Sequence, residues 1–199
     1  MIDYSKLAKG YDENYKSDWC RRENYEISLL LARHLPKSAK VVDIGCGTGL
    51  TLDVTYRHKD FLHYEIKPDD YTGIDTSLEM LRIAIEKHPE YKFERKPAKS
   101  VKKNRYKAAL CLFSIPYITE EAVEPIVEAL KKNGVLICVY YDKPYRNDCS
   151  VYYGRKWYYR FFVHPKVKRI MKQFGKKLTL VESGLLTQQG AYRYAIFKK

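Results

Sequence analysis

The chain has 199 residues, of which 45 % are hydrophobic, a length and composition typical of one compact domain with a sizeable core. Its formal net charge of +13 would draw nucleic acid, nucleotides or other anions to the surface. The alternative role of this charge is a solvated, self-repelling surface that keeps the protein soluble. No apolar run reaches membrane-spanning length and the first residues lack the order of a secretion signal, so we expect a cytoplasmic protein without a membrane contact.

The first predicted helix covers residues 24–35, where apolar side chains recur at helical spacing until Pro36 ends the pattern. A predicted strand follows at residues 41–44. It is short, rich in valine and isoleucine, and bounded by Gly45, as is typical of a strand buried on both faces.

Three later apolar runs, at residues 71–74, 108–113 and 135–140, repeat the form of that strand. Helical patterns separate them at residues 78–86 and 120–132. The second helical pattern begins with acidic residues and ends with lysines before a glycine, as the helix dipole favours. Strands that alternate with helices predict an α/β fold, a three-layer sandwich with a mainly parallel sheet.

The end of the chain has a different pattern. Residues 178–182 and 192–197 are strand-like, and a turn at Ser183-Gly184 and a polar stretch join them, which predicts a closing hairpin.

The five cysteines argue against a zinc cage or a disulfide framework, because they are odd in number and form no Cys-x-x-Cys pair. We expect reduced thiols and no metal site. Cys111 and Cys138 lie inside apolar runs, where a thiol acts as a small hydrophobic group.

The most informative segment runs from Val41 to Leu50 and places Gly45, Gly47 and Gly49 between a predicted strand and a helix. Glycines allow a tight turn and let backbone N–H groups approach a ligand, and the next helix adds positive potential. A dinucleotide fingerprint has its third glycine one residue later, and Asp43 would repel a pyrophosphate but attract an ammonium group. The loop therefore predicts a site for the amino-acid end of S-adenosylmethionine, with a plain glycine turn as the alternative.

A second motif covers residues 71–77, where a predicted strand ends in Asp75. A carboxylate at this position can hold a ribose diol through two hydrogen bonds. The alternative role of Asp75 is to cap the next helix, although Ser77 can serve as the cap by itself.

The segments VVDIGCGTG and GIDTSLEML together resemble the motifs of class I S-adenosylmethionine-dependent methyltransferases. The resemblance implies one such domain over residues 1–199, with a seven-stranded sheet whose last strand is antiparallel. It implies S-adenosylmethionine as the cofactor and covering helices within residues 1–35, and we expect an aromatic and basic lid insertion at residues 141–175. The cofactor-binding residues on this basis are Tyr11, Asp43, Gly45, Cys46, Gly47, Gly49, Asp75, Thr76, Met80, Ala98 and Phe113. Tyr11 is equally well explained as a packing tyrosine.

Three features depart from the family pattern. The connection near residues 56–70 is longer than usual and is expected to contain an inserted loop. Pro97-Ala98 stands where an Asp-Ala pair often contacts the adenine amine, so adenine recognition would rely on backbone and apolar contacts. Lys107 replaces the acid that usually precedes the fourth strand.

Ser114 and Tyr117 are the predicted catalytic residues, because they follow the fourth strand at the sheet edge where the methyl group should project. An in-line methyl displacement needs alignment and exclusion of water more than it needs a strong base. The segment Ser114 to Tyr117 resembles the Asn/Asp/Ser-x-Pro-aromatic motif of amino-group methyltransferases. Small-molecule members of the family also often carry a serine followed by an aromatic residue here.

Two basic segments have open roles. Residues 152–162 combine aromatic with basic side chains and could stack on a base, form a lid over a small aromatic substrate, or pack as a helix on the sheet. Residues 92–107 would extend a phosphate-binding face if they lie near the site, and are otherwise a solvated run. His164 either acts as a base or lies on the surface.

The expected function is transfer of a methyl group from S-adenosylmethionine to an N or O nucleophile of a small molecule. The alternatives are an adenine-N6-type nucleic-acid methyltransferase, which the basic balance and the Ser114 to Tyr117 segment favour, and a non-catalytic cofactor-binding protein. The acceptor and the oligomeric state stay undetermined.

Overall fold

The computed structural model describes residues 8–15, 18–57, 65–141, 152–153, 156–157, 165–186 and 192–199. The strands are β1 (Val41–Ile44), β2 (Tyr71–Asp75), β3 (Lys92–Arg95), β4 (Tyr106–Leu112), β5 (Leu130–Tyr141), β6 (Tyr152–Tyr153), β7 (Lys156–Trp157), β8 (Thr179–Leu185) and β9 (Tyr192–Lys198). The α-helices are α1 (Asp18–His34), α2 (Leu50–Arg57), α4 (Leu78–Lys87), α5 (Val123–Ala129) and α6 (Pro165–Lys177). Short 3₁₀ helices are η2 (Ala8–Gly10), η3 (Asp12–Tyr15), η4 (Pro68–Asp70), η5 (Ala98–Ser100), η6 (Ile115–Tyr117) and η7 (Glu120–Ala122).

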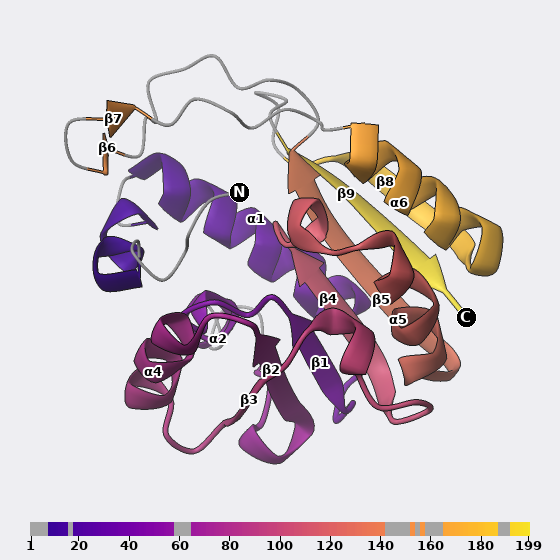
Figure 1. The fold of residues 1–199 in the computed structure, drawn as a ribbon, viewed down its shortest axis with the longest axis horizontal. Coiled ribbons are helices and arrows are strands. Elements are labelled where there is room, and N and C mark those ends of the chain that lie inside the picture. Colours follow the sequence, from indigo (N-terminus) through magenta and orange to yellow (C-terminus); the bar gives the residue numbers. More distant parts are fainter. Residues whose placement is uncertain are drawn as a thin grey trace.

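The main sheet has seven strands in the order β3-β2-β1-β4-β5-β9-β8 (Figure 1). From β3 to β5 every neighbouring pair of strands is parallel. β9 is antiparallel to both β5 and β8, so it alone reverses the strand direction. The predicted α/β sheet with an antiparallel last strand is confirmed.

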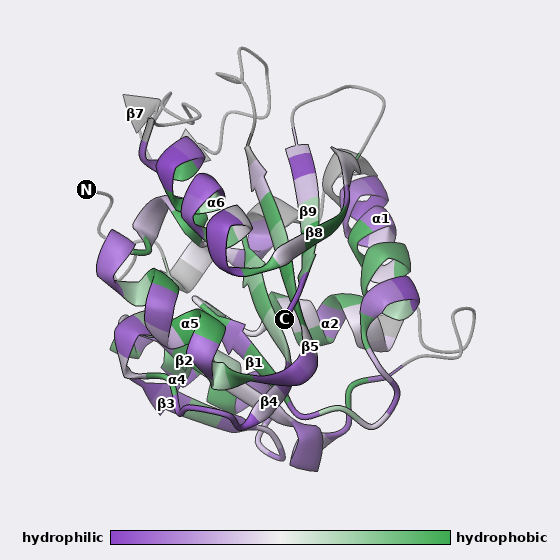
Figure 2. Cartoon of the chain, turned by 90° about the vertical axis from the view of Figure 1, so that its right-hand side faces the viewer, coloured by the Kyte–Doolittle hydropathy of each residue, from purple (hydrophilic) through white to green (hydrophobic). Residues whose placement is uncertain are grey.

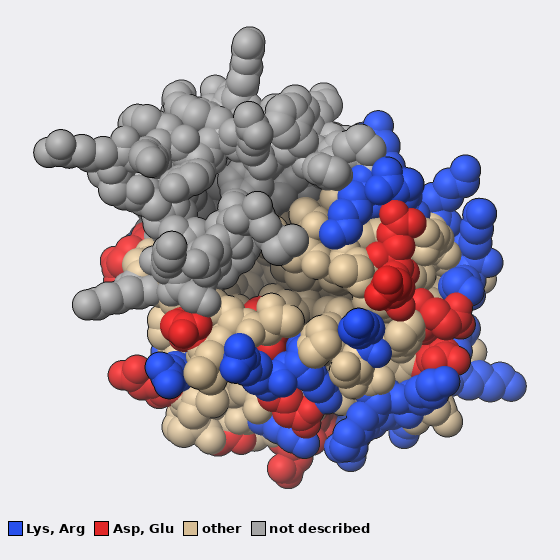
Figure 3. Space-filling model, viewed as in Figure 1, with Lys and Arg blue, Asp and Glu red and all other residues tan. Residues whose placement is uncertain are grey.

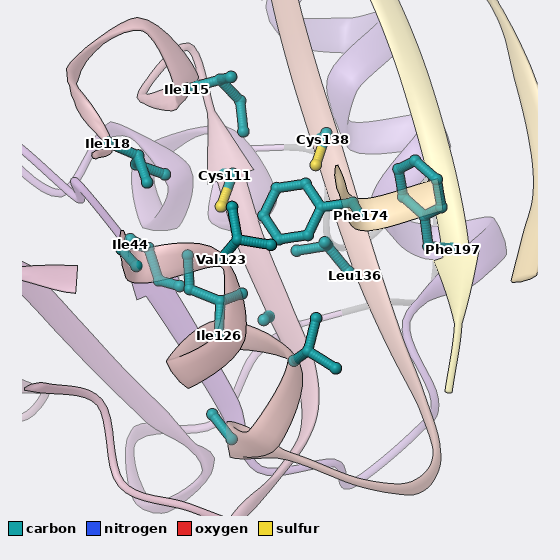
Figure 4. Close-up of a cluster of buried hydrophobic side chains, with 14 of the residues drawn as sticks. Ile44, Cys111, Ile115, Ile118, Val123, Ile126, Leu136, Cys138, Phe174 and Phe197 are labelled. Carbon is teal, nitrogen blue, oxygen red and sulfur yellow. The ribbon is translucent and has the colours of Figure 1, made fainter. Parts of the chain in front are cut away.

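Helices cover both faces of this sheet, and each face has its own core. Figure 2 shows α1 and α2 on one side of the strands and α5 and α6 on the other. The core under α5 and α6 includes Val123, Ile126, Ile170 and Phe174, and Figure 4 shows the ring of Phe174 lying among side chains of that core. The core under α1 and α2 is formed by a second cluster. A parallel sheet buried on both faces explains why its central strands read as continuous apolar runs.

The N-terminal helix is longer than its apolar pattern predicts. The buried residues Ile27, Leu30, Leu31 and Leu35 confirm the predicted inward face, but α1 begins at Asp18 instead of residue 24. Residues 1–7 of the predicted covering segment lie outside the described part of the chain.

The predicted helix over residues 120–132 is wrong at its end, because α5 stops at Ala129. Leu130 is extended, fully buried, and paired with Tyr106 of β4 as the first residue of β5. Pairing across the sheet therefore overrides the lysine-rich helix ending that the sequence suggests.

The closing hairpin is confirmed, but the turn predicted at Ser183-Gly184 is wrong. Both residues lie within β8 and pair with Ala195 and Tyr194 of β9. The connection that joins β8 to β9 includes residues 187–191, which lie outside the described residues.

The predicted lid insertion at residues 141–175 is too long at its C-terminal end. Residues 165–175 belong to α6, whose Val167, Ile170 and Phe174 are buried in the core against the sheet. Between β5 and α6 the structure describes only the short two-stranded pair β6–β7, so the remainder of the predicted lid lies outside the described residues.

Among the helices that the structure describes, none combines the length and the apolar character needed to cross a membrane.

Candidate functional site

The loop between β1 and α2 is left-handed at all three of its glycines. The φ angles of Gly45, Gly47 and Gly49 are 75°, 55° and 79°, a region that glycine adopts far more readily than other residues. A Cβ on Gly45 would lie 2.5 Å from the Cβ of Ser114, so the end of β4 approaches the loop closely there. A Cβ on Gly47 would meet nothing within 4 Å. The loop is thus packed against protein at Gly45 and open at Gly47, where a ligand can approach the backbone.

Asp75, the last residue of β2, joins that loop to the neighbouring strand. Its Oδ2 accepts a 3.0 Å hydrogen bond from the N–H of Gly47, and its Oδ1 accepts a 2.8 Å bond from the N–H of Ser77. The N-cap of α4 is Ser77, whose hydroxyl accepts from the N–H of Met80. Capping is therefore the role of Ser77, and Asp75 lies half-buried beside the open part of the loop.

Asp43 lies inside the protein instead of on the loop surface. Its side chain is 1 % exposed, and its Oδ2 accepts a 2.9 Å hydrogen bond from the hydroxyl of Tyr71. Burial raises the pKa of Asp43 to about 6, hydrogen bonds from Thr51 and Tyr71 oppose that rise, and the nearby charge of Asp75 adds to it. A direct contact between Asp43 and the ammonium group of a ligand stays a prediction. Because Asp43 is buried, its charge reaches the loop residue Cys46 without exposure to solvent.

These two carboxylates give the loop a negative electrostatic bias. A cation bound at the loop would relieve the repulsion between Asp43 and Asp75, whereas a phosphate would add to it. The open backbone at Gly47 together with this bias fits the ammonium and sulfonium groups of S-adenosylmethionine.

Cys46 is a packing residue in this loop. It is 6 % exposed, and burial, with the charges of Asp43 and Asp75, raises the pKa of its thiol well above the ordinary value. A Cβ on Gly73 would lie 2.9 Å from its Sγ, so β2 also approaches the loop closely. A thiol with so high a pKa is a poor nucleophile.

The residues predicted near the adenine lie in three different settings. Thr76 is exposed, and its carbonyl accepts a 3.2 Å hydrogen bond from Nε of Arg95. Met80 is 1 % exposed and buried, and Ala98 begins η5 and packs partly against the core. Only Thr76 of the three is freely accessible, so their contact with a base stays a prediction.

A polar network that the sequence does not suggest connects the N-terminal segment to the glycine loop. Nζ of Lys87 donates to Oδ2 of Asp12 at 2.7 Å, to the carbonyl of Thr48 at 3.1 Å and to Asp53. Thr48 also donates to Asp12 at 2.5 Å, and Nε2 of His88 lies 2.9 Å from Asp53.

This network places the predicted residue Tyr11 beside the loop, because Tyr11 directly precedes Asp12. Although burial raises the pKa of Asp53, hydrogen bonds from His88 and Lys87 lower it overall, so the carboxylate is charged. The network joins three separate parts of the sequence, at residues 12, 48–53 and 87–88, and only the adjacency of Asp12 to Tyr11 could have drawn attention to it.

The predicted catalytic pair is divided between buried and exposed positions. Ser114 is 7 % exposed, and its Oγ has no hydrogen-bond partner among the described residues, so a polar group is oriented near the loop without a contact. Tyr117 lies in η6 and is 41 % exposed. Phe113 has a φ of 59° and its ring centroid lies 5.1 Å from that of Tyr192, at the start of β9. The structure brings Ser114 and Phe113 to the loop and leaves Tyr117 nearer the surface.

The predicted basic run at residues 92–107 is partly neutralised. Lys92 and Lys96 both pair with Glu94, and Nζ of Lys103 lies 2.9 Å from Glu128. His164 and most of residues 152–162 lie outside the described part of the chain, so the roles proposed for them stay predictions.

Basic side chains, among them four from the end of this run, gather at the edge of the sheet opposite the glycine loop, which we call the basic rim. They adjoin the N-terminal ends of β1, β4, β5 and β8 and the C-terminal end of β9, whereas the glycine loop follows the C-terminal end of β1. Figure 3 shows lysine and arginine side chains along the lower and right-hand margin of one face. The basic rim consists of Lys40, Lys102, Lys103, Arg105, Lys107, Lys131, Lys132, Lys176, Lys177, Lys198 and Lys199.

Within the described residues, no cluster of three or more His, Cys, Asp or Glu side chains could hold a metal ion.

A family model described as a methyltransferase domain matches residues 11–179 of the chain. The ubiquinone/menaquinone biosynthesis C-methyltransferase UbiE of Campylobacter jejuni is 27 % identical over 143 residues, which cover 69 % of this chain and 56 % of that protein. The chain thus spans about half the length of that curated relative.

The solved structures that share the fold at low sequence identity include the following two. The [4+2]-cyclase SpnF superposes with a TM-score of 0.73 at 15 % identity, covering 98 % of this chain and 94 % of the other. The 1,6-didemethyltoxoflavin-N1-methyltransferase of Burkholderia thailandensis, with bound S-adenosylhomocysteine, gives 0.63 at 18 % identity, covering 98 % and 86 %.

Proposed function

The chain belongs to the class I S-adenosylmethionine-dependent methyltransferases, and from that premise we propose that it methylates an N or O nucleophile of a small molecule. A nitrogen acceptor is supported by the N1-methyltransferase that shares its fold. UbiE, which is named as a C-methyltransferase, shows that relatives differ in the atom methylated.

One observation supports this function above the others: the open backbone at Gly47, beside Asp75 and above the buried carboxylate of Asp43. In this arrangement the loop and Asp43 would hold the methionine part of S-adenosylmethionine, and Asp75 its ribose. The bound cofactor supplies a methyl group on a positively charged sulfur. The protein must align an acceptor with that methyl group and exclude water, a role for which Phe113 and Ser114 are placed at the loop.

Calorimetry with S-adenosylhomocysteine tests the cofactor site. We expect Asp75→Ala to weaken binding about ten-fold or more, because the carboxylate orders the loop and is the predicted ribose ligand. Asp69→Ala is the matched control, since Asp69 is exposed in η4. Equal affinity in both variants and the unchanged protein would refute the site assignment. A screen of small-molecule acceptors with methyl-labelled cofactor then tests the activity itself.

The nucleic-acid alternative is favoured by the net charge of +13 and by the Ser114 to Tyr117 segment. The basic rim, however, lies at the sheet edge opposite the glycine loop, so a polyanion bound there would not lie over the site. We therefore place the small-molecule function first.

A further inference from the structure

A buried carboxyl group on α1 has no role in the site as described so far. Glu23 is 6 % exposed, and its Oε1 has no hydrogen-bond partner among the residues that the structure describes. The hydroxyl of Tyr192 donates a hydrogen bond to the carboxyl group. A buried carboxyl oxygen without a partner carries a desolvation penalty that a bound ligand can offset.

Glu23 lies at the catalytic edge of the sheet. Tyr192 begins β9 and pairs with Tyr141, the last residue of β5, so its position is at the C-terminal ends of the parallel strands (Figure 1). The ring of Tyr192 contacts that of Phe113, which follows β4 and adjoins Ser114 at the glycine loop. A continuous line of contacts therefore leads from the loop through two aromatic rings to the Glu23 carboxyl group.

The surroundings of Glu23 suit an amine more than an anion. Among the described residues, burial and the Tyr192 hydrogen bond are what shift its pKa, which burial raises to about 8, and no lysine or arginine contributes to the shift. An ammonium group of a substrate can displace the proton of this carboxyl group and pair with the resulting carboxylate next to the aromatic rings. A phosphate or carboxylate substrate would find no cation at this position among the described residues, and it would hold the carboxyl group in its neutral form.

We propose that Glu23 is a catalytic residue of the acceptor site: it binds the ammonium group of an amine substrate and takes the proton that the nitrogen must lose before methylation. The proposal rests on the proposed methyltransferase function and narrows its acceptor to an amine. The steps balance. As the ammonium binds, Glu23 releases its own proton to the solvent and becomes a carboxylate. The ammonium then transfers one proton to the Glu23 carboxylate, and the lone pair of the free amine forms a bond to the methyl carbon. The carbon–sulfur bond breaks, its electron pair stays on sulfur, and the product leaves as an N-methylammonium.

The test compares Glu23→Gln with the control Glu26→Gln, since Glu26 lies on the same helix and lines a different surface depression with Leu185 and Tyr194. The probes are a panel of primary amines, each with the alcohol of the same skeleton, headed by phenethylamine and 2-phenylethanol. In the unchanged protein and in Glu26→Gln, loaded with S-adenosylhomocysteine, at least one amine should bind about ten-fold tighter than its alcohol. Glu23→Gln should abolish that preference and lower the rate of amine methylation about 100-fold.

Proton release gives a readout that a purely structural role would not change. Near pH 7 the Glu23 carboxyl group of the free protein holds a proton, and pairing with an ammonium group should displace it to the solvent. Calorimetry of amine binding in buffers of different ionisation enthalpy should show release of about one proton, and Glu23→Gln should remove that release. The proposal is overturned if no amine is preferred over its alcohol, or if Glu23→Gln matches Glu26→Gln. If the unchanged protein does not bind S-adenosylhomocysteine at all, the proposed function itself is refuted, so the two failures are distinguishable.

Discussion

Two glycines of the loop share a positive φ angle but differ in the space around them. Gly45 needs both a positive φ and the absence of a Cβ, because Ser114 lies so close. Gly47 needs the positive φ but has open space around it. We therefore expect Gly45 to be needed for packing of the fold and Gly47 to be needed for access of a ligand to the loop.

This difference predicts that alanine at Gly45 mainly lowers stability, whereas alanine at Gly47 mainly weakens ligand binding. Gly45→Ala should lower the free energy of unfolding by about 3 kcal/mol, since it adds a steric clash to a strained backbone. Gly47→Ala should cost only about 1 kcal/mol but weaken S-adenosylhomocysteine binding about ten-fold, because its Cβ would occupy ligand space. Urea denaturation and calorimetry measure both quantities. Gly10→Ala is the control, as it meets nothing within 4 Å and lacks a positive φ. Equal loss of stability at Gly45 and Gly47 would contradict this division.

The raised pKa of Glu23 predicts that the free energy of unfolding falls as the pH rises. Its pKa of about 8 in the folded protein lies above the ordinary 4.5, so between these values the folded chain retains a proton that the unfolded chain has released. The stability linked to this group is complete at low pH and is lost as pH rises towards 8. Relative to the unchanged protein, Glu23→Gln should thus gain on the order of 3 kcal/mol between roughly pH 5 and pH 8. Parallel curves of unfolding free energy against pH for the two proteins would show that Glu23 titrates normally.

At the scale of elements, the N-terminal segment is connected to the glycine loop by the side chains of Lys87 in α4 and Thr48 in the loop, which both contact Asp12. Lys87 of α4 contacts Asp12 of η3 and Asp53 of α2, so one side chain joins three elements around the loop. The covering role predicted for residues 1–35 therefore has a physical basis in the described residues 8–15, although it stays a prediction.

Removal of the Lys87 ammonium should release this segment. In Lys87→Met, backbone amides of residues 8–15 should exchange about ten-fold faster, which corresponds to roughly 1.4 kcal/mol of lost local stability. Hydrogen exchange followed by mass spectrometry measures the change. The control is Lys92→Met, because Lys92 forms a surface ion pair with Glu94 away from the segment. Unchanged exchange in Lys87→Met would mean that packing alone holds the segment.

Elements also show where local sequence signals fail. The lysines and glycine after α5 resemble a helix ending, yet Leu130 already belongs to β5 because it pairs with Tyr106. Ser183-Gly184 resembles a turn, yet Gly184 is part of β8 and pairs with Tyr194, and a Cβ on Gly184 would lie 3.0 Å from the hydroxyl of Tyr194. Both errors arise where a partner strand, distant in the chain, determines the backbone conformation.

At the scale of the whole molecule, the basic rim and the proposed site lie at opposite edges of the sheet. The glycine loop and Glu23 lie at the C-terminal edge, and the basic rim lies at the N-terminal edge. The surplus charge of the chain therefore does not describe the electrostatics of its site, where buried carboxylates dominate.

This separation predicts that binding of nucleic acid and of cofactor are independent. Affinity for a random RNA should fall steeply between roughly 50 and 200 mM salt and should fall further in Lys131→Glu/Lys132→Glu. The affinity for S-adenosylhomocysteine should not change in that variant. Filter binding and calorimetry measure the two affinities. If the variant loses both, or if RNA accepts a labelled methyl group, the nucleic-acid function would replace the small-molecule one.

The fold class, the family and the glycine loop with Asp43 and Asp75 could be predicted from the amino-acid sequence, because they depend on short segments whose conformation and chemistry are local. Apolar runs identify buried strands, and glycines mark a turn whose positive φ angles other residues adopt less readily. Three other features became visible only in the folded chain: Asp43 is buried against Tyr71, Lys87 connects Asp12 to the loop, and Glu23 lies beside Tyr192. The burial of a charged group and the identity of its partner depend on residues far away in the chain, so a local sequence pattern does not reveal them.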